Sequence, residues 1–514
     1  MGTSPAAPIG SNQFVDAVED SVDGAPVAVT DSQRLVDQLR YEHPDYIVRR
    51  PKWDKYFSCY AADDIYKFIH KHPRESDDMF ALRLQRGYFY NYTSSIVDLY
   101  VSYLFHSPIE RREGTEKELL SEMYEDSDNA GTKYLSFMQD VATNAQVFGW
   151  CGVLVDAPAY DKAAVESEQD RENAGIRPYL AIIEPIQIKD WELDRDGNFA
   201  WVKIKIYRPQ GRSWQTPESE DACNYVIWSK TDWVEYQVVG EDAKIVGSGE
   251  HSLGQVPLII VRNVRDPRHK WMGMSAIRDI ADINLAILNW SSFGDEEIAN
   301  RCLNLLCMER DTTGNAAQTL SHHNVLEYES GSEPPQYLTP GETPLQMIGQ
   351  WIDRGKDEIY RIAKLGGSTG LLGVREATSG IAYAYEFNET NQSLSKKAES
   401  LEHAETEIHK LYLLWLNKTF DGSIIYPREF GVDDYLVEMQ MLEQARSALT
   451  SETAIKQIEK KLNAKFFARE TTEFRQKIDA EIEKADPAMG LAVLTQFEQV
   501  PAEQLQGTAP KKPE

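Results

Sequence analysis

Cysteine is scarce in this sequence, and the few that occur are scattered. The chain has five cysteines and no CxxC pair. Such spacing supports neither a disulfide framework nor a zinc site and indicates a reducing compartment. Cys302 and Cys307 lie in an apolar run, where we expect buried thiols.

Long hydrophobic runs are also missing. No stretch approaches the roughly 18 consecutive apolar residues of a membrane-spanning helix, so we expect no membrane span. The first residues, MGTSPAAPIGSNQF, have neither the basic start nor the apolar centre of a secretory signal. The sequence alone therefore predicts a protein made in the cytoplasm, with no membrane partner.

Positive charge is in short supply. Lys and Arg number 54 against 82 Asp and Glu, so the net charge is −28. A protein that grips nucleic acid through its phosphates is normally basic. Either DNA is not a partner of this chain, or DNA is handled without being held tightly.

Motifs for catalysis are absent as well. The glycine-rich stretch GGSTGLLG (366–373) lacks the GK[ST] ending of a phosphate-binding loop and follows a helix instead of a strand. There is no HExxH and no G-x-S-x-G. The acidic stretch 126–131 has no Glu at the twelfth position of a calcium loop, which favours an ordinary turn. We expect no cofactor, no metal and no enzymatic activity.

The remaining pattern predicts an α+β fold that is mainly helical. Residues 77–105 are apolar around much of a helical circumference and predict one long buried helix. The helix that starts at Tyr134 should break at Gly149 and pass into a buried strand. Hairpins at 181–208 and 225–239, with a strand at 254–263, predict one antiparallel sheet of four to six strands. Tyr88, Phe89, Tyr90 and Tyr92 could stack on bases, but a core role is favoured.

The second half of the chain is dominated by helices. Residues 275–300 carry an isoleucine stripe at helical spacing, with Asp279 and Asp282 off it. Residues 301–341 are strand and turn in character, and a helix restarts at Thr343 and runs to 365. The longest helix should end at Gly422. Its seam, in which intramolecular core is favoured over a subunit contact, repeats every seven residues: Leu394, Leu401, Ile408 and Trp415.

Four stretches, in this order along the chain, are similar to the tailed-bacteriophage portal protein family. They are RGYFYNYTSSIVDLYVSYLF (86–105), NAQVFGWCGVLVD (144–156), GMSAIRDIADINLAILNWSSFGDE (273–296) and ATSGIAYAYEFNETNQSLSKKAESLEHAE (377–405). They resemble the family's wing helix, helix–Gly–strand element, first stem helix, and tunnel loop with spine helix. The resemblance covers roughly residues 35–485.

The resemblance implies a portal-type fold with a wing, a two-helix stem, a small α/β clip, a spine helix and a helical crown. The implied parts are a disordered arm (1–34), the wing (35–270), stem helix 1 (271–301), the clip (302–342), stem helix 2 (343–365), the tunnel loop (366–387), the spine and wing (388–431), the crown (432–498) and a disordered tail (499–514). It also implies a ring of usually twelve copies at one capsid vertex of the virion, made in the host bacterial cytoplasm.

The resemblance further implies roles for particular residues. The tunnel loop would face DNA with Gly366, Gly367, Ser368, Thr369, Gly370, Arg375, Thr378, Ser379 and Gly380. The stem channel wall would carry Asp279, Asp282, Arg354, Lys356, Arg361 and Lys364. The clip would dock the motor and adaptor through Glu309, Arg310, Asp311, His322, His323 and Glu327. For the stem cations, surface ion pairs are favoured over intersubunit pairs or a basic ring.

The implied partners are double-stranded DNA without sequence specificity, the terminase large subunit, a neck or adaptor protein, and the major capsid and scaffold proteins. The acidic charge fits this role, because a like-charged channel wall repels phosphate instead of trapping it. Two alternatives are a terminase-like packaging ATPase and a minor capsid or scaffold-binding protein without a channel. The missing Walker A motif argues against the first.

Overall fold

The computed structural model describes residues 31–158, 177–206, 223–302, 305–307, 336–338, 343–365, 380–430, 452–466 and 472–484. Helices outweigh strands among these residues, and all paired strands are antiparallel. This confirms the α+β, mainly helical fold. Within the same ranges, no helix combines the length and apolar character that crossing a membrane requires.

The N-terminal part is a series of helices that pack around the body. They are α1 (Asp31–Arg40), α2 (Pro44–Ala61), the 3-10 turn η1 (Ile65–Phe68), α3 (Asp77–Arg86) and α4 (Tyr92–Leu104). The prediction of one helix over 77–105 is wrong. The side chain of Asn91 accepts a hydrogen bond from Ser94 N at 2.9 Å and caps a new helix. The residues between the two helices, from Gly87 onwards, are therefore not helical.

The chain then builds the element that joins helix to strand at a glycine. β1 (Glu110–Arg112), η2 (Gly114–Glu116) and α5 (Lys117–Glu125) precede α6 (Tyr134–Phe148), which leads into β2 (Trp150–Asp156). Gly149 has φ +97°, and a Cβ there would lie 2.5 Å from Ser275 N. Only glycine combines that backbone conformation with so close an approach. The predicted break at Gly149 is confirmed.

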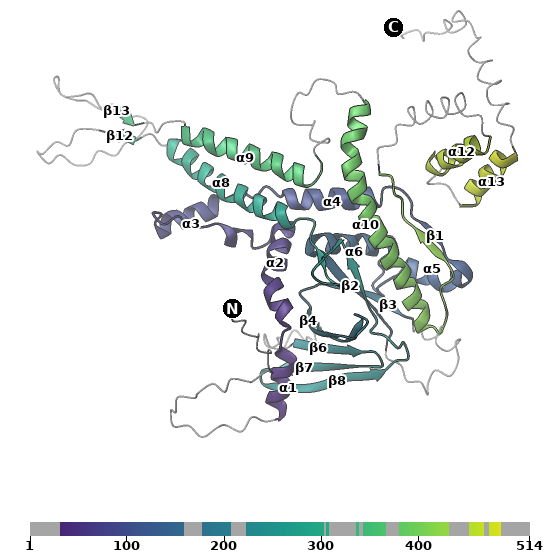
Figure 1. Ribbon diagram of the computed structural model, residues 1–514. Coiled ribbons are helices and arrows are strands. Elements are labelled where there is room, and N and C mark those ends of the chain that lie inside the picture. The colour runs from purple at the N-terminus through teal and green to yellow at the C-terminus, as the bar shows by residue number, and fades with distance from the viewer. Residues whose placement is uncertain are drawn as a thin grey trace, which may run out of the picture.

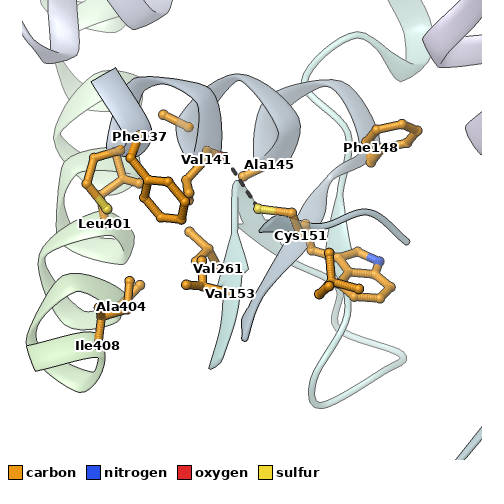
Figure 2. Close-up of a cluster of buried hydrophobic side chains, with 14 of the residues drawn as sticks. Phe137, Val141, Ala145, Phe148, Cys151, Val153, Val261, Leu401, Ala404 and Ile408 are labelled. Carbon is orange, nitrogen blue, oxygen red and sulfur yellow. Dashed lines mark hydrogen bonds between the residues drawn. The ribbon is translucent and has the colours of Figure 1, made fainter. Parts of the chain in front are cut away.

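A three-stranded sheet forms the centre of the core. It has the order β3 (Tyr179–Ile183), β2 and β9 (Leu258–Arg262). Figure 2 shows Phe137, Val141 and Ala145 of α6 above Val153 and Val261 of this sheet. The long helix α10 (Gly380–Trp415) packs beside it. These elements, far apart in the sequence, share one buried cluster.

A second sheet has five strands in chain order. They are β4 (Ile188–Leu193), β5 (Phe199–Ile206), β6 (Cys223–Ser229), β7 (Asp232–Val239) and β8 (Asp242–Glu250). Both predicted hairpins are present, and Gly197 turns the first with φ +88°. The single predicted sheet is wrong, because the turn at Glu184–Gln187, closed by a 2.9 Å backbone hydrogen bond, sends β3 and β4 into different sheets.

A lysine lies among the buried residues of the second sheet: Lys203. This lysine of β5 is buried, and its Nζ donates to the backbone oxygens of Gln38 at 2.9 Å and Tyr41 at 2.7 Å. The end of α1 therefore covers that part of the sheet. Burial of the ammonium lowers the pKa of Lys203, and the nearby Asp190 opposes that shift.

Two long helices and a small hairpin follow the sheets. α8 (Arg278–Cys302) leads to β12 (Leu305–Cys307), which pairs with β13 (Gln336–Leu338), and α9 (Thr343–Ile362) returns. The predicted helix at 275–300, the strand character of the insert and the restart at Thr343 are confirmed in these described parts. Two further short pairs, β10 (Val264–Arg265) with β11 (Gly273–Met274) and β1 with β14 (Ser423–Ile425), complete the strands of the described ranges.

The boundaries of α10 differ from prediction at both ends. The helix begins at Gly380, so residues 380–387 are helical and not part of a loop that extends to 387. Ala and Glu in this stretch are good helix formers, and no proline interrupts it. The helix ends at Trp415 and not at Gly422. Lys418 N bonds to Leu413 O and Asn417, with φ +55°, bonds to Leu414 O, which is a Schellman ending.

The apolar seam of α10, which repeats every seven residues, is part of the intramolecular core, as expected from the sequence. Leu394, Leu401 and Ile408 are buried, and Figure 2 shows the last two beside α6 and the sheet. The indole nitrogen of Trp415 donates to Val155 O at 2.9 Å. Because its contacts run from Leu394 to Trp415, α10 keeps one position relative to the rest of the body.

A buried carboxylate fastens α10 to both short strands beside it. Glu405 is fully buried and accepts hydrogen bonds from Arg111 Nε of β1 and from the hydroxyl of Tyr426, just after β14, both at 2.5 Å. Burial, together with this carboxylate, raises the pKa of Tyr426 well above its ordinary value. His409, one turn on, is buried as well and meets Tyr124 OH at 2.8 Å.

The C-terminal described residues form a helix pair, α12 (Glu452–Phe466) and α13 (Thr472–Lys484). Asn463 donates to Asp479 at 2.8 Å, and Lys460 pairs with Glu483. Polar and charged side chains therefore connect the two helices.

Candidate functional site

The helix pair α8 and α9 stands out from the body as a single arm. In Figure 1 the two helices run side by side away from the body, and the β12–β13 hairpin lies at their far end. In β12 and β13, Leu305 is opposite Leu338. This arm is the segment in which the sequence predicts a stem and a clip, so its surface is the candidate functional site.

Glycine lets the two helices of the arm approach closely. A Cβ on Gly355 of α9 would lie 3.0 Å from Ile287 and 3.2 Å from Trp290 of α8. A Cβ on Gly294 of α8 would meet Ile348 at 3.4 Å. The two glycines therefore face side chains of the opposite helix near the middle of the arm. Ile359 closes the packing near the body, where it is fully buried.

The two predicted acidic wall residues of α8 lie on its surface. Asp279 pairs with Arg278 at 3.1 Å, and Asp282 pairs with Lys55 of α2 at 2.5 Å. Both carboxylates are mostly solvent-exposed. Asp282 thus tethers the base of the arm to α2, which is a structural contact that the sequence did not indicate.

The predicted cations of α9 are mostly neutralised within their own helix. Lys356 pairs with Asp353 at 2.6 Å, and Arg361 pairs with Glu358 at 2.5 Å. The hydrogen bond that the Lys356 ammonium donates to Asp353 raises the pKa of Lys356. In the single chain both residues form surface ion pairs, and their place in a channel wall stays a prediction. Arg354 instead lies over the ring of Trp351, 5.2 Å from its centroid.

The C-terminal end of α9 is anchored to the body. The hydroxyl of Tyr100 in α4 donates to Ala363 O, and Thr390 of α10 donates to Lys364 O. Lys364 itself has φ +58°, a conformation that ends a helix. Residue 365 is buried, and α10 begins at Gly380. The segment 366–379 is therefore flanked by one anchored helix end and by the start of the longest helix.

A buried lysine lies next to Tyr100, which bonds to the end of α9. Lys397 of α10 is almost fully buried; its Nζ donates to Asn263 Oδ1 and lies 5.1 Å from the Tyr100 ring centroid. Burial lowers its pKa from 10.5 to about 7. The hydroxyl of Tyr100 also donates to Ala363 O. Through Tyr100, the side chain of Lys397 therefore connects α10 to the C-terminal end of α9.

Most of the predicted tunnel-loop and clip residues lie outside the described residues. These are Gly366, Gly367, Ser368, Thr369, Gly370, Arg375, Thr378 and Ser379, together with Glu309, Arg310, Asp311, His322, His323 and Glu327. Their roles stay predictions. Gly380 is described, as the first residue of α10.

The sequence missed an aromatic surface beside the arm, in the segment between α3 and α4. Tyr88 and Tyr90 are exposed, so the predicted core role is wrong for these two, whereas Phe89 and Tyr92 pack against buried clusters. Gly87 and the capping Asn91 take this segment out of helical geometry and turn alternate side chains outward. Gly87 and Asn91 are therefore the features of the sequence that could have predicted this exposed aromatic segment.

A groove of about 620 Å³ runs along α8 on another side of the arm. Its lining includes the apolar residues Phe68, Leu285, Trp290 and Phe293 and the charged residues Lys55, Lys71 and Asp282. In the described ranges, no group of three or more His, Cys, Asp or Glu side chains could hold a metal ion. The surface chemistry of the arm is thus aromatic and charged, which suits macromolecular contact.

No protein-family model and no curated protein matches the sequence. Among solved structures, the chain is similar to one titled "Neck of empty GTA particle computed with C6 symmetry", with 11% identity and a TM-score of 0.42, covering 71% of this chain and 89% of that chain. It is also similar to "Neck of native GTA particle computed with C12 symmetry", with 11% identity and a TM-score of 0.40, covering 82% of this chain and 96% of that chain. Function is therefore inferred from the chain's own residues.

Proposed function

We propose that this chain is the subunit of a portal ring, which forms the DNA channel at one vertex of a phage-like capsid. The observation that carries the proposal is the order and geometry of four parts. An antiparallel helix pair leaves the body, carries a hairpin at its tip, returns to an anchored end at Ala363, and is followed by 366–379 and the long helix α10. The proposed ring has about twelve copies.

Each part has a mechanical role in this proposal. The α8–α9 arms of all copies line up as the stem around the channel. The insert between them, at the far end of the arm, docks the terminase large subunit during packaging and a neck protein afterwards. The body, with α10 as its axis, contacts the major capsid and scaffold proteins. The chain performs no catalysis in this scheme.

The charge of the arm supports weak contact with DNA. Lys356 and Arg361 are each paired with an acidic neighbour, and the whole chain carries −28. Such a surface does not hold phosphate through many free cations, so a duplex passes with contacts that salt easily screens. Ser368, Thr369 and Arg375 of the segment 366–379 are the proposed points of approach to the backbone.

Single-particle imaging of the purified chain, with mass by light scattering, tests the proposal. We expect a ring of about twelve subunits with an axial hole of roughly 20 Å or more, because the major groove of the duplex alone is about 12 Å wide. The stem and the segment 366–379 should line the hole. A closed assembly without a hole would contradict the conduit role.

Replacing residues 367–379 by a Gly-Ser linker of equal length tests the role of that segment. The anchors at Ala363 and Thr390 remain, so we expect rings of normal mass. DNA packaging into capsids should fall, because the side chains that follow the duplex are gone. Normal packaging would remove DNA guidance from this segment while leaving the ring proposal intact.

Two other functions are separated by simple measurements. A terminase-like ATPase would hydrolyse ATP with or without DNA, and we expect no hydrolysis above background. A minor capsid or scaffold-binding protein would bind capsid or scaffold without forming a ring, which the imaging detects.

A further inference from the structure

Two different aromatic surfaces lie on opposite sides of the α8–α9 arm. On α9, Trp351 meets Trp290 of α8 at a ring distance of 5.9 Å, whereas Tyr360 meets Tyr92 at 6.4 Å. These two residues of α9 are nine positions apart, which is about two and a half helical turns. They therefore point to opposite sides of the helix pair.

Helix α8 has the same division. Phe293 lines the groove beside Trp290, whereas Asn284, nine positions earlier, accepts a hydrogen bond from Tyr92 N at 3.4 Å. Ser291 also faces the tyrosine side, because its hydroxyl donates to Tyr88 O at 3.4 Å. Both helices thus contribute to each of the two surfaces.

We name the first surface the tryptophan flank, which comprises Trp290, Phe293, Met347 and Trp351. Met347 is 53% exposed and Trp351 is 49% exposed. Arg354 over Trp351 borders it, as do Lys55 and Lys71 of the groove, which pair with Asp282 and Asp77. The flank is an open apolar strip with a basic edge.

We name the second surface the tyrosine flank, which comprises Tyr88, Tyr90, Tyr92 and Tyr360. Neighbouring rings lie 4.9 Å, 6.4 Å and 6.4 Å apart along the series. Tyr88 is 61% exposed and Tyr90 is 47% exposed. On α9, Asp353 and Asp357 precede Tyr360 by seven and three residues, so they lie on its side of the helix. This flank is aromatic with an acidic edge.

We propose that the tryptophan flank of one copy docks on the tyrosine flank of the next copy. Exposed aromatic side chains are enriched in the centres of protein interfaces. The two flanks differ in residues and in charge, so neither complements itself across a two-fold axis. A contact between unlike patches of identical chains repeats head to tail, and it closes into a ring when the rotation from copy to copy adds up to a full turn.

Charge complementarity favours a second copy of this chain as the molecule that binds to each flank. The edge of the tryptophan flank brings Lys55, Lys71 and Arg354, and the edge of the tyrosine flank brings Asp353 and Asp357. Ion pairs within one chain offset part of both charges: Lys55 pairs with Asp282 and Lys71 with Asp77 on the basic edge, and Lys356 pairs with Asp353 on the acidic edge. Arg354 on one edge and Asp357 on the other carry the charge that these pairs leave. The remaining difference sets the orientation of the contact more than its strength. This inference rests on the proposed ring and assigns the surfaces that close it.

Three single variants test the assignment. Trp351→Glu places a charge in the tryptophan flank, and Tyr90→Glu places one in the tyrosine flank. Leu135→Glu is the matched control, because Leu135 is an exposed apolar residue of α6 outside both flanks. We expect the control to form rings like the unmodified chain. Each flank variant should need about tenfold or more protein to reach the same ring fraction in mass photometry.

Mixing the two flank variants gives the sharper test. Tyr90→Glu keeps an intact tryptophan flank, and Trp351→Glu keeps an intact tyrosine flank. A head-to-tail contact predicts that the equimolar mixture forms a dimer of one copy of each and stops there. Formation of this dimer also shows that both variants are folded, because each must present a working surface.

The outcomes separate this inference from the ring itself. Rings from the unmodified chain and equally from both flank variants would overturn the flank assignment and leave the portal proposal standing. A mixture that yields no dimer would also overturn the assignment. An unmodified chain that stays monomeric at all concentrations would overturn the ring, and the assignment with it.

Discussion

Helix α10 in the body and the α8–α9 arm differ in how far their polar and aromatic side chains are exposed to solvent. In α10, Lys397, Glu405 and His409 are buried and meet partners from the same chain. In the arm, Trp351 and Met347 leave about half of their side-chain surface in solvent. These three polar side chains of α10 thus have partners within their own chain. The arm instead displays apolar surface without cover from the described residues.

This difference indicates where stability and assembly reside. A buried polar network with every member partnered fixes one arrangement of the elements around it. An arm with aromatic residues on both sides gains most from contact with other molecules. We therefore expect changes in α10 to act on the unfolding of the single chain, and changes on the arm to act on association.

Replacing Glu405 with alanine should produce the largest loss of stability. The change leaves the partly buried Arg111 without its fully buried carboxylate partner and leaves the hydroxyl of Tyr426 without its acceptor. Removing one partner of a buried ion pair costs about 3–5 kcal/mol. The free energy of unfolding in denaturant measures this. Glu407→Ala is the control, since Glu407 pairs with Lys410 at the surface and its loss should cost no more than about 1 kcal/mol.

Lys397 should make the stability of the body depend on pH above neutrality. Its pKa is about 7 in the folded chain and 10.5 when exposed. Below pH 7 both states hold the proton, and above pH 10.5 neither does. Between these values the unfolded state binds more protons, so the free energy of unfolding rises with pH, by up to about 1.4 kcal/mol per unit.

The variant Lys397→Met should remove that rise. From pH 7 to 9 we expect a gain of about 2 kcal/mol in the unmodified chain that is missing in the variant. Lys396→Met, at the exposed neighbouring position, should keep it. Equal slopes in all three chains would show that the amine of Lys397 is charged in the folded state throughout this range.

Gly355→Leu should loosen the arm while sparing the body. The new side chain would collide with Ile287 and Trp290, where even a Cβ comes within about 3 Å. Overpacking of this kind costs about 1–3 kcal/mol. Hydrogen exchange should show the loss in α8 and α9 and not in α10. Gly349→Leu on the same helix meets nothing within 4 Å and should have no such effect.

Features set by a few neighbouring residues could be predicted from the sequence. Gly149 ends a helix because its backbone is left-handed and its surroundings leave no room for a Cβ. The turn at Asp196-Gly197 and the heptad of α10 likewise carry their signals locally. The isoleucine stripe of α8 was enough to place the first helix of the arm, with Ile277, Ile280 and Ile287 all buried.

Features set by distant parts of the chain could not be predicted. Whether β3 joins β4 in one sheet depends on a turn that directs them to different partners. The exposure of Tyr88 depends on the break at Gly87 and on where α8 lies. The pairing of Asp282 with Lys55 joins residues 227 positions apart. For the same reason, an apolar helix sequence alone did not show that the arm keeps two aromatic flanks open.

The smallest effect is expected for Lys356→Ala on the surface of the arm. Its ion pair with Asp353 lies within one helix turn and is partly exposed, so its loss should change the free energy of unfolding by less than about 0.5 kcal/mol. The ring should respond more than the fold does. With Lys356 gone, Asp353 is free to attract the basic edge of the neighbouring tryptophan flank, and we expect tighter assembly at low salt that disappears as salt is added. Weaker assembly at low salt would mean that Lys356 itself contacts the next copy, and the acidic character assigned to the tyrosine flank would be wrong.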